Sequence, residues 1–311
     1  NEARIMASAQ FIRSGIKLLS SSPKKRICRL CVSASLTKSW CNEPEPTITS
    51  LMLFLSICLK LFIINSTFFD DVDGVYVYDS SETINKYVDG TDTRFKLISG
   101  DAGATVGVAK NALLKAMKDD GMEHLFLQED DVKITKPEVF DAYIQTAMVS
   151  GLWGSLNYAW HGSSNKDNLG IPIIKNSIDY ENGLGIEFTQ HGSASFSYIH
   201  TKIIDVVGYH DEFYENCWEH LDFFLRQSNL NLASCWWWFT DIKDSSQYFI
   251  ELDNSELDNS VIRKDPKWLE NMNIGVKYFQ DKFGFKPNLV PHADESQVLS
   301  KMKKIKNLYG S

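Results

Sequence analysis

Short apolar runs alternate with a helical segment over residues 75–127. Val75–Tyr78, Phe95–Ile98 and His124–Leu127 are rich in strand-forming residues, and Thr105–Met117 has apolar residues at helical spacing. Short buried strands joined by helices are typical of a parallel sheet that is covered on both faces. The sequence therefore predicts an α/β fold with a mostly parallel central sheet flanked by helices.

Acidic residues follow each of the predicted strands. Asp79 ends the first run, Asp101 follows the second, and Glu129, Asp130 and Asp131 follow the third. The ligand site of such a sheet lies at the carboxyl ends of its strands. Three adjacent carboxylates repel one another, and a divalent cation such as Mn²⁺ or Mg²⁺ offsets that repulsion. Solvated acids at a turn or a helix N-terminus explain the triplet equally well when it is taken alone.

Composition narrows the classes of function. The 311 residues carry a net charge of -8 and 43% of them are hydrophobic, which fits a folded globular protein and disfavours a surface built to grip DNA. The lysines within 301–306 form a local basic patch, which is either solvated surface or a contact for phosphate groups such as those of DNA. Six scattered cysteines are too few for a disulfide scaffold, so we expect a reducing compartment.

The most apolar stretch is too short to cross a bilayer. Leu51–Ile64 has about fourteen residues and includes Lys60, whereas a transmembrane helix needs about twenty. We expect no transmembrane segment, and the first residues lack the pattern of a secretory signal. These features predict a cytoplasmic location, with peripheral attachment to a membrane as an alternative. The oligomeric state stays open.

Changes in sequence character divide the chain into three parts. Residues 1–24 form a predicted helix or extension, 25–250 the main domain, and 251–311 a helical C-terminal extension. In the second half of the main domain, polar loops and short antiparallel strands are expected. A helix is predicted over 206–227, and a buried strand over Trp236–Phe239.

Five segments, taken in order, resemble the successive signatures of the family 2 glycosyltransferases. They are 75–81 (VYVYDSS), 107–116 (GVAKNALLKA), 124–132 (HLFLQEDDV), 207–213 (VGYHDEF) and 218–226 (WEHLDFFLR). Each segment is weak alone, and their order carries the resemblance. The resemblance implies a GT-A fold, in which a nucleotide-binding half joins a smaller acceptor-binding half. It also implies transfer of a sugar from a nucleoside-diphosphate donor to an acceptor hydroxyl, with inversion at the anomeric carbon.

The resemblance implies donor-binding roles for residues of the first half. Asp79 would face the base or ribose of the nucleotide, and Lys110 and Asn111 would lie on the helix that covers it. Ser33, which follows a short apolar run, is a further nucleotide-binding candidate. On local grounds, Asp79 is equally a turn-forming residue, and Asn111 an ordinary amide on a helix surface.

The expected metal site also follows from the resemblance. Asp131 would ligate the cation, while Glu129 or Asp130 would support the ribose or a bound water. Asp241, just after the predicted aromatic strand, is placed to supply a further ligand, and His292 is the reserve. A lone carboxylate or imidazole has many ordinary structural uses, so a structural role is the alternative for both.

The transfer needs a base that takes the proton of the acceptor hydroxyl. In the family, an acidic pair at a helix start supplies it, and this chain has Glu219 and His220 there. Glu219 alone, His220 in place of the missing carboxylate, or Asp222 after a small change of register could serve, and Glu219 is favoured. Asp222 and Arg226 also have the spacing of a structural ion pair on a helix.

The sequence therefore predicts a metal-dependent hexosyltransferase or related sugar transferase. Its acceptor is a glycan, a lipid-linked sugar, a protein or another hydroxyl compound, with DNA disfavoured. A nucleotidyltransferase is one alternative, although residues 33–38 lack the glycine-rich basic loop that it would need. The other alternative is a nucleotide-sugar-binding module that has lost catalysis, and His220 is the feature in its favour.

Overall fold

A computed structural model describes residues 28–29, 33–34, 72–79, 94–101, 104–129, 132–215, 217–251 and 266–311, the first two pairs by their main chain alone. The helix predicted within 1–24 and the apolar stretch 51–64 lie outside these residues, as do Asp130 and Asp131. Within the described ranges, no helix combines the length and the hydropathy that a bilayer span requires.

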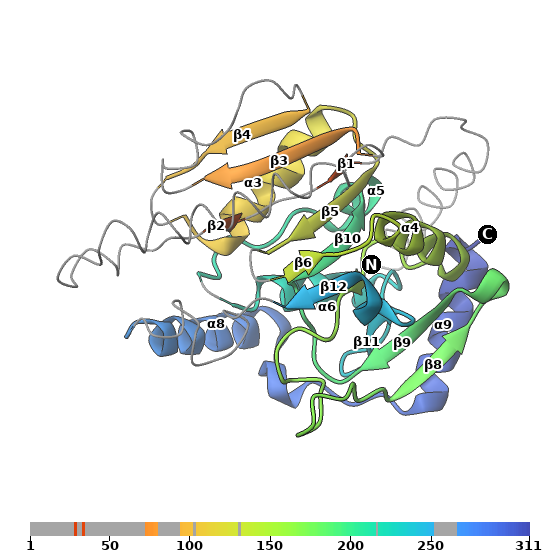
Figure 1. The fold of residues 1–311 in the computed structure, drawn as a ribbon. Coiled ribbons are helices and arrows are strands. Elements are labelled where there is room, and N and C mark those ends of the chain that lie inside the picture. Colours follow the sequence, from red (N-terminus) through yellow and green to blue (C-terminus); the bar gives the residue numbers. More distant parts are fainter. Residues whose placement is uncertain are drawn as a thin grey trace.

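Strands and helices follow one another along the chain as Figure 1 shows. The strands are β1 (Cys28–Arg29), β2 (Ser33–Ala34), β3 (Gly74–Asp79), β4 (Phe95–Ser99), β5 (His124–Gln128), β6 (Val132–Ile134), β7 (Leu156–Asn157), β8 (Asn176–Asp179), β9 (Gly185–Thr189), β10 (Phe196–His200), β11 (Phe239–Ile242) and β12 (Phe249–Glu251). The α-helices are α3 (Val106–Asp119), α4 (Val139–Ser150), α5 (Thr201–Val207), α6 (Glu219–Asn229), α8 (Trp268–Phe283) and α9 (Glu295–Tyr309). Short 3₁₀ turns are η5 (Glu181–Gly183), η6 (Ser245–Tyr248) and η8 (Pro287–Leu289).

A parallel sheet forms around β3. β4 pairs along one edge of β3, while β1 and β2 pair with the beginning and the end of its other edge. Every residue of β3 is buried, as expected for a parallel strand that is covered on both faces. The strands predicted at 75–78 and 95–98 and the helix predicted at 105–117 are confirmed by β3, β4 and α3.

The second sheet corrects the prediction of a mostly parallel fold. Its strand order is β5-β10-β7-β11-β9-β8, and each neighbouring pair except β7 with β11 is antiparallel. The connections give the reason, because β8 and β9 are joined by a turn that is too short for a parallel crossover. β1 runs beside β5, so the two sheets meet along that edge (Figure 1). The fold is mixed α/β, and its paired strands are mostly antiparallel.

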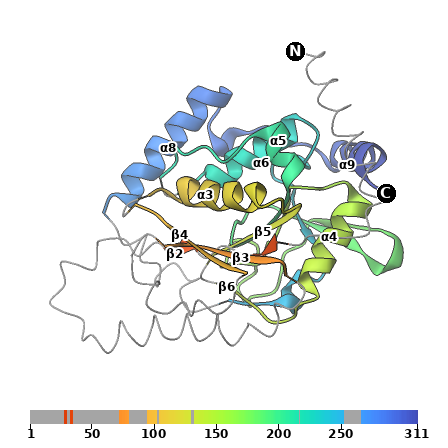
Figure 2. The same ribbon diagram turned by 90° about the horizontal axis from the view of Figure 1, so that it is seen from above.

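The carboxyl ends of three strands define one side of the molecule. β3, β4 and β5 all point the same way in Figure 1, with Asp79 as the last residue of β3 and Glu129 directly after β5. Figure 2 shows α3, α5, α6 and α8 on one face of the strands. The Thr105 hydroxyl caps α3 by accepting a hydrogen bond from the Val108 amide at 3.2 Å. This side-chain cap fixes the start of α3.

Two groups of buried apolar side chains hold these layers together. The larger fills the space among the sheets, α3, α4 and α9, and contains Leu114, Tyr143 and Ile305. The smaller lies where α6 meets α8, and contains Phe224 and Phe279. The predicted helical character of 265–311 is confirmed by α8 and α9. Both C-terminal helices thus contribute to the buried core.

Two predicted elements have different boundaries in the structure. The helix predicted over 206–227 is interrupted between α5 and α6, where Gly208 has a φ of 82°. The strand predicted over Trp236–Phe239 begins only at Phe239, because Trp237 has a left-handed backbone with a φ of 67°. Aromatic side chains favour strands, but packing of Trp236 and Trp237 in a turn decided the backbone here.

Gly151, at the end of α4, tests how tightly that helix is packed against α9, and Gly284, at the end of α8, is its control. Both Gly151 and Gly284 end a helix in the left-handed conformation, with φ of 81° and 86°. A Cβ at Gly151 would lie 2.8 Å from the Ile305 carbonyl oxygen, whereas a Cβ at Gly284 meets nothing within 4 Å. We expect Gly284→Ala to cost about 1 kcal/mol of unfolding free energy and Gly151→Ala about 3 kcal/mol. Urea denaturation measures both, and equal losses would contradict the close approach.

Candidate active site

Three segments that are far apart in the sequence meet at one buried ammonium group. Lys110 lies in the second turn of α3, Glu129 directly follows β5, and Glu219 is the first residue of α6. The Lys110 Nζ atom donates to Glu129 Oε1 and to Glu219 Oε1, at 2.9 Å in both cases. All three residues are candidates from the sequence pattern, and the structure brings them together.

Neighbouring charges outweigh burial in setting the protonation of this cluster. Lys110 is 4% exposed and Glu219 is 2% exposed, whereas the Glu129 side chain is 32% exposed. Burial alone would lower the pKa of Lys110, but Glu129 and Glu219 raise it above its ordinary value. Burial alone would raise the pKa of Glu219, but Lys110 and His220 hold it well below its ordinary range. Glu219 is therefore a carboxylate at neutral pH and accepts a further proton weakly.

The backbone that leads into Glu219 is strained. Trp218 has a φ of 79°, which is uncommon for a bulky residue. Its ring lies against Gly275 of α8, where a Cβ would come within 2.8 Å of Trp218 Cδ1. Glu219 and Asp222 both lie in the first turn of α6, where the helix dipole favours negative charge. Strained backbone of this kind is concentrated at functional sites.

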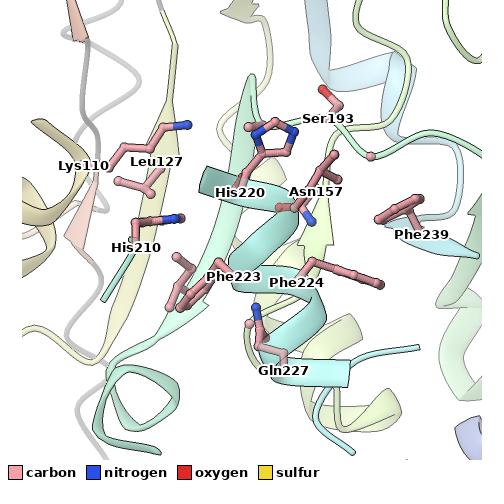
Figure 3. Close-up of a pocket in the computed structure, with 16 residues that line it drawn as sticks. Lys110, Leu127, Asn157, Ser193, His210, His220, Phe223, Phe224, Gln227 and Phe239 are labelled. Carbon is pink, nitrogen blue, oxygen red and sulfur yellow. The ribbon is translucent and has the colours of Figure 1, made fainter. Parts of the chain in front are cut away.

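His220 lies beside Glu219 and is open to solvent. Its Nδ1 atom is 3.3 Å from Glu219 Oε1, and its side chain is 26% exposed. Because a carboxylate only accepts hydrogen bonds, Nδ1 of the neutral ring carries the proton and Nε2 keeps its lone pair. Figure 3 shows the ring with Lys110 on one side and Ser193 and Asn157 on the other. A carboxylate-imidazole pair can take a proton at Nε2 and stabilise the imidazolium that forms.

A small cavity extends from His220 into the protein. Its volume is about 20 Å³, which is water-sized, so a nucleotide does not fit inside it. His210 Nε2 and Gln227 Oε1 are buried atoms of the cavity lining that make no hydrogen bond within the described part of the chain. Burial and Lys110 lower the pKa of His210 to about 3, so its ring is neutral.

The segment 207–213 is fixed by hydrogen bonds from both sides. The Asn111 side chain donates to the His210 carbonyl and accepts from its amide, both at 2.9 Å. Asn111 also donates to Glu212 Oε1 at 2.8 Å. From α6, the Arg226 guanidinium donates to two carbonyls of the segment at 2.6 and 2.7 Å. Asn111 thus joins α3 to this segment, a contact that the sequence did not predict.

Asp222 lies within a structural network. It is fully buried and accepts from Arg226 Nε at 2.7 Å, from Lys282 Nζ at 2.6 Å and from the Tyr214 hydroxyl at 3.2 Å. The helix ion pair considered for Asp222 and Arg226 is therefore present. A carboxylate in this position has no access to an acceptor hydroxyl, so the geometry favours its structural role over that of the base.

Asp241 is also buried among donors. Tyr143 and the Ile242 amide donate to its Oδ1 at 2.6 and 2.8 Å. The Ala159 amide and Ser245 donate to its Oδ2 at 2.9 and 2.5 Å. These bonds occupy both carboxylate oxygens and fit the structural alternative. A metal-binding role for Asp241 stays a prediction.

The other selected residues lie at different places. Asp79 is 1% exposed at the end of β3, and Ser33 pairs with Tyr78 in the neighbouring strand. Both lie at the carboxyl end of the parallel sheet, and their nucleotide-binding roles stay predictions. His292 is exposed and stacks on Trp237 with ring centroids 4.9 Å apart. Its contact with Trp237 gives it an evident packing role.

Another cluster with metal-ligating side chains lies at the opposite end of β5. Glu123, His124 and His200 offer ligand atoms within 4.8 Å of one another, the one such group in the described ranges. However, His200 Nδ1 accepts from the Lys202 amide at 3.1 Å. Nε2 of the neutral ring therefore carries the proton, and it has no lone pair for a metal ion.

Several residues around His220 were not selected from the sequence. Asn157, Ser193, His210 and Gln227 line the same cavity, but they come from four separate segments and have ordinary structural uses. Two of them could have been found from their position in the sequence, because His210 lies inside the segment 207–213 and Gln227 directly follows the segment 218–226. Asn157 and Ser193 had no such signal.

Comparisons with known proteins do not assign this chain to a family. No family model matches the chain, and no curated protein matches it. Residues 1–349 of TarS from S. aureus, in complex with UDP, align at 15% identity over 91% of this chain and 81% of that chain, with a TM-score of 0.41. TarS 1–349 in a second crystal structure aligns at 14% identity over 75% and 71%, with a TM-score of 0.35. Likenesses this weak establish neither a shared family nor a shared function.

Asp241 gives a pH-dependent test of its structural role. Burial raises its pKa from 3.8 to about 7, so between these values the folded state holds a proton that the unfolded state has released. Stability therefore falls as pH rises through this window, by up to about 1.4 kcal/mol per pH unit for this group. Asp241→Asn removes this contribution. Urea denaturation of both proteins from acid to neutral pH tests it, and unchanged pH slopes in the variant would contradict it.

Proposed function

We propose that this protein is a glycosyltransferase that moves a sugar from a nucleoside-diphosphate donor to an acceptor hydroxyl. The supporting observation is the joining of Lys110, Glu129 and Glu219, because each comes from a different segment of the family 2 resemblance. A buried cation with two carboxylates and a neighbouring, partly exposed imidazole is an arrangement found in catalytic sites. The donor lies on the open side of the cluster, beside Glu129 and the end of β3.

His220 is the proposed proton acceptor of the reaction. Its Nε2 atom takes the proton of the acceptor hydroxyl while the acceptor oxygen forms a bond to the anomeric carbon. The bond from that carbon to the donor phosphate oxygen breaks, its electron pair leaves with the diphosphate, and the configuration inverts. Glu219 orients the imidazole through Nδ1 and stabilises its charged form. The sequence favours Glu219 as the base, but the hydrogen bond from Lys110 makes Glu219 a weak base.

The proposed metal ion is held by Asp131, with Glu129 or Asp130 in support. A divalent cation bound there supplies charge neutralisation for the departing diphosphate. Lys110 holds Glu129 at the edge of this region by its 2.9 Å hydrogen bond. Glu129, with its side chain 32% exposed, is available to a ribose hydroxyl or a cation-bound water.

His220→Gln tests the proposed base. Loss of a general base lowers kcat by about 100-fold or more, while the KM for the donor changes little because the residue lies on the acceptor side. Glu219→Gln should lower kcat as well, and Glu270→Gln, an exposed change on α8, serves as the matched control.

The same variants distinguish the alternatives. Full activity of His220→Gln together with an inactive Glu219→Gln would assign the base to Glu219. If the parent protein binds a donor and neither transfers nor hydrolyses it, the protein is a nucleotide-sugar-binding module. Product analysis of the sugar configuration tests inversion.

Metal dependence is tested by thermal denaturation with nucleoside diphosphates and their sugars, with and without Mn²⁺. We expect donor binding to raise Tm only when Mn²⁺ is present, because binding to the folded state alone stabilises it. Asp131→Asn should remove the Mn²⁺-dependent increase, while the exposed control Glu270→Gln should retain it. An increase that is independent of Mn²⁺ would contradict the metal requirement.

A further inference from the structure

A short loop before β8 exposes an unusual number of aliphatic side chains. Within residues 167–174, here called the apolar loop, Leu169 is 82% exposed, Ile171 55%, Ile173 51% and Ile174 45%. They are four of the ten large exposed apolar residues in the described part of the chain. Single exposed apolar residues are ordinary, but a contiguous group marks a surface that binds something.

The apolar loop is held in a defined conformation by hydrogen bonds within the loop and to the two residues before it. Asp167 Oδ1 accepts from the Leu169 and Ile171 amides at 2.8 and 2.9 Å. The Ile173 amide donates to the Asn165 carbonyl at 2.7 Å, and Lys166 and Pro172 form an antiparallel bridge. The loop therefore presents its aliphatic side chains on a fixed turn, and Figure 1 shows this segment protruding beyond β8.

The base of the apolar loop is connected to the candidate active site. Asn165 is 3% exposed, and its amide nitrogen donates to the carbonyls of Ala159 and His191 at 2.8 and 2.9 Å. Its Oδ1 accepts from the His191 amide at 3.0 Å. The next residues, Gly192 and Ser193, line the cavity beside His220. One buried side chain thus links the loop to the acceptor side of the site.

The chemistry of the apolar loop selects among partners. Its large exposed side chains are all aliphatic, whereas the cores of protein interfaces are enriched in aromatic residues, methionine and arginine. The flanking lysines serve internal contacts, since Lys166 pairs with Glu251 and Lys175 donates to the Trp237 carbonyl at 2.8 Å. The loop therefore offers apolar area without a basic patch, on a chain of net charge -8. This combination suits the acyl layer of an electrically neutral membrane and disfavours a polyanion.

We propose that the apolar loop inserts into the surface of a lipid bilayer and holds the acceptor side of the site at the membrane. The inference that the protein binds a bilayer rests on the apolar loop alone. The consequence that the acceptor is a lipid-anchored hydroxyl compound rests on the proposed glycosyltransferase function. Insertion transfers Leu169, Ile171, Ile173 and Ile174 from water into the acyl boundary. Because Lys166 and Lys175 are balanced by Asp167 and Glu251, the loop has no net positive charge, and we expect its binding to be insensitive to salt.

The test is flotation of the full chain with phosphatidylcholine vesicles, without any donor or acceptor. We expect the protein to float with the vesicles, and the double change Leu169→Ser with Ile171→Ser to reduce the partition coefficient about tenfold or more. The matched control is Leu269→Ser with Ile274→Ser, which removes two exposed aliphatic side chains from α8 and should leave the partition unchanged. Equal Tm of the variants and the parent shows that folding is intact.

Three results would overturn the proposal. They are absence of vesicle binding by the parent, equal loss in both double variants, and binding that requires anionic lipid and disappears in salt. Loss of self-association in the loop variant, measured by light scattering without vesicles, would instead assign the loop to contact between copies of the chain. Since flotation uses no substrate, its outcome is independent of the glycosyltransferase assays. A protein that floats but transfers no sugar would retain the membrane inference and lose the proposed function.

Discussion

The ammonium group of Lys110 lies inside the protein between two carboxylates, and the surrounding elements are arranged to keep it there. Its 2.9 Å bonds to Glu129 and Glu219 join α3, the end of β5 and the start of α6. Removing one partner of a buried ion pair typically costs about 3–5 kcal/mol, because the remaining charge stays buried and uncompensated. Here a single cation satisfies two carboxylates, so the position of Lys110 sets the relative position of three elements. The same charge keeps Glu219 ionised, so Glu219 accepts a proton weakly and acts as a hydrogen-bond acceptor for the His220 ring.

A second set of charges secures the helix that carries Glu219 and His220. Asp222 is one turn further along α6 and joins Arg226 on the same helix to Lys282 on α8. Arg226 extends this network to the carbonyls of segment 207–213, which α3 reaches through Asn111. Segment and helix are thus fixed to each other and to α3, and the strained Trp218 backbone lies between them. Such a network holds Glu219 and His220 in place through the hydrogen bonds of the residues around them.

The proposed reaction assigns different sides of the ion cluster to the donor and to the acceptor. Glu129 directly follows β5 and marks the proposed donor side, while His220, Asn157 and Ser193 line one cavity and mark the proposed acceptor side. The replacement of an expected acid by His220 has a physical rationale in this arrangement. A second carboxylate beside Glu219 would add negative charge next to a buried anion, whereas an imidazole is neutral before it accepts a proton and is stabilised by Glu219 afterwards.

By itself, the sequence determined the early strands and helix, because apolar periodicity and strand length are local properties. It also selected Lys110, Glu129, Glu219 and His220, since the order of the motifs is visible along the chain. The tertiary structure decided what local patterns cannot encode: the antiparallel pairing of β5 with β10, which joins the predicted parallel strand β5 to the antiparallel strands of the second half, the break before α6, and the burial that separates Asp222 and Asp241 from His220. These depend on contacts between distant segments, such as Arg226 with 207–209 and Asp241 with Tyr143. The same carboxylate group is a ligand, a base or an internal hydrogen-bond acceptor according to the donors that folding brings to it.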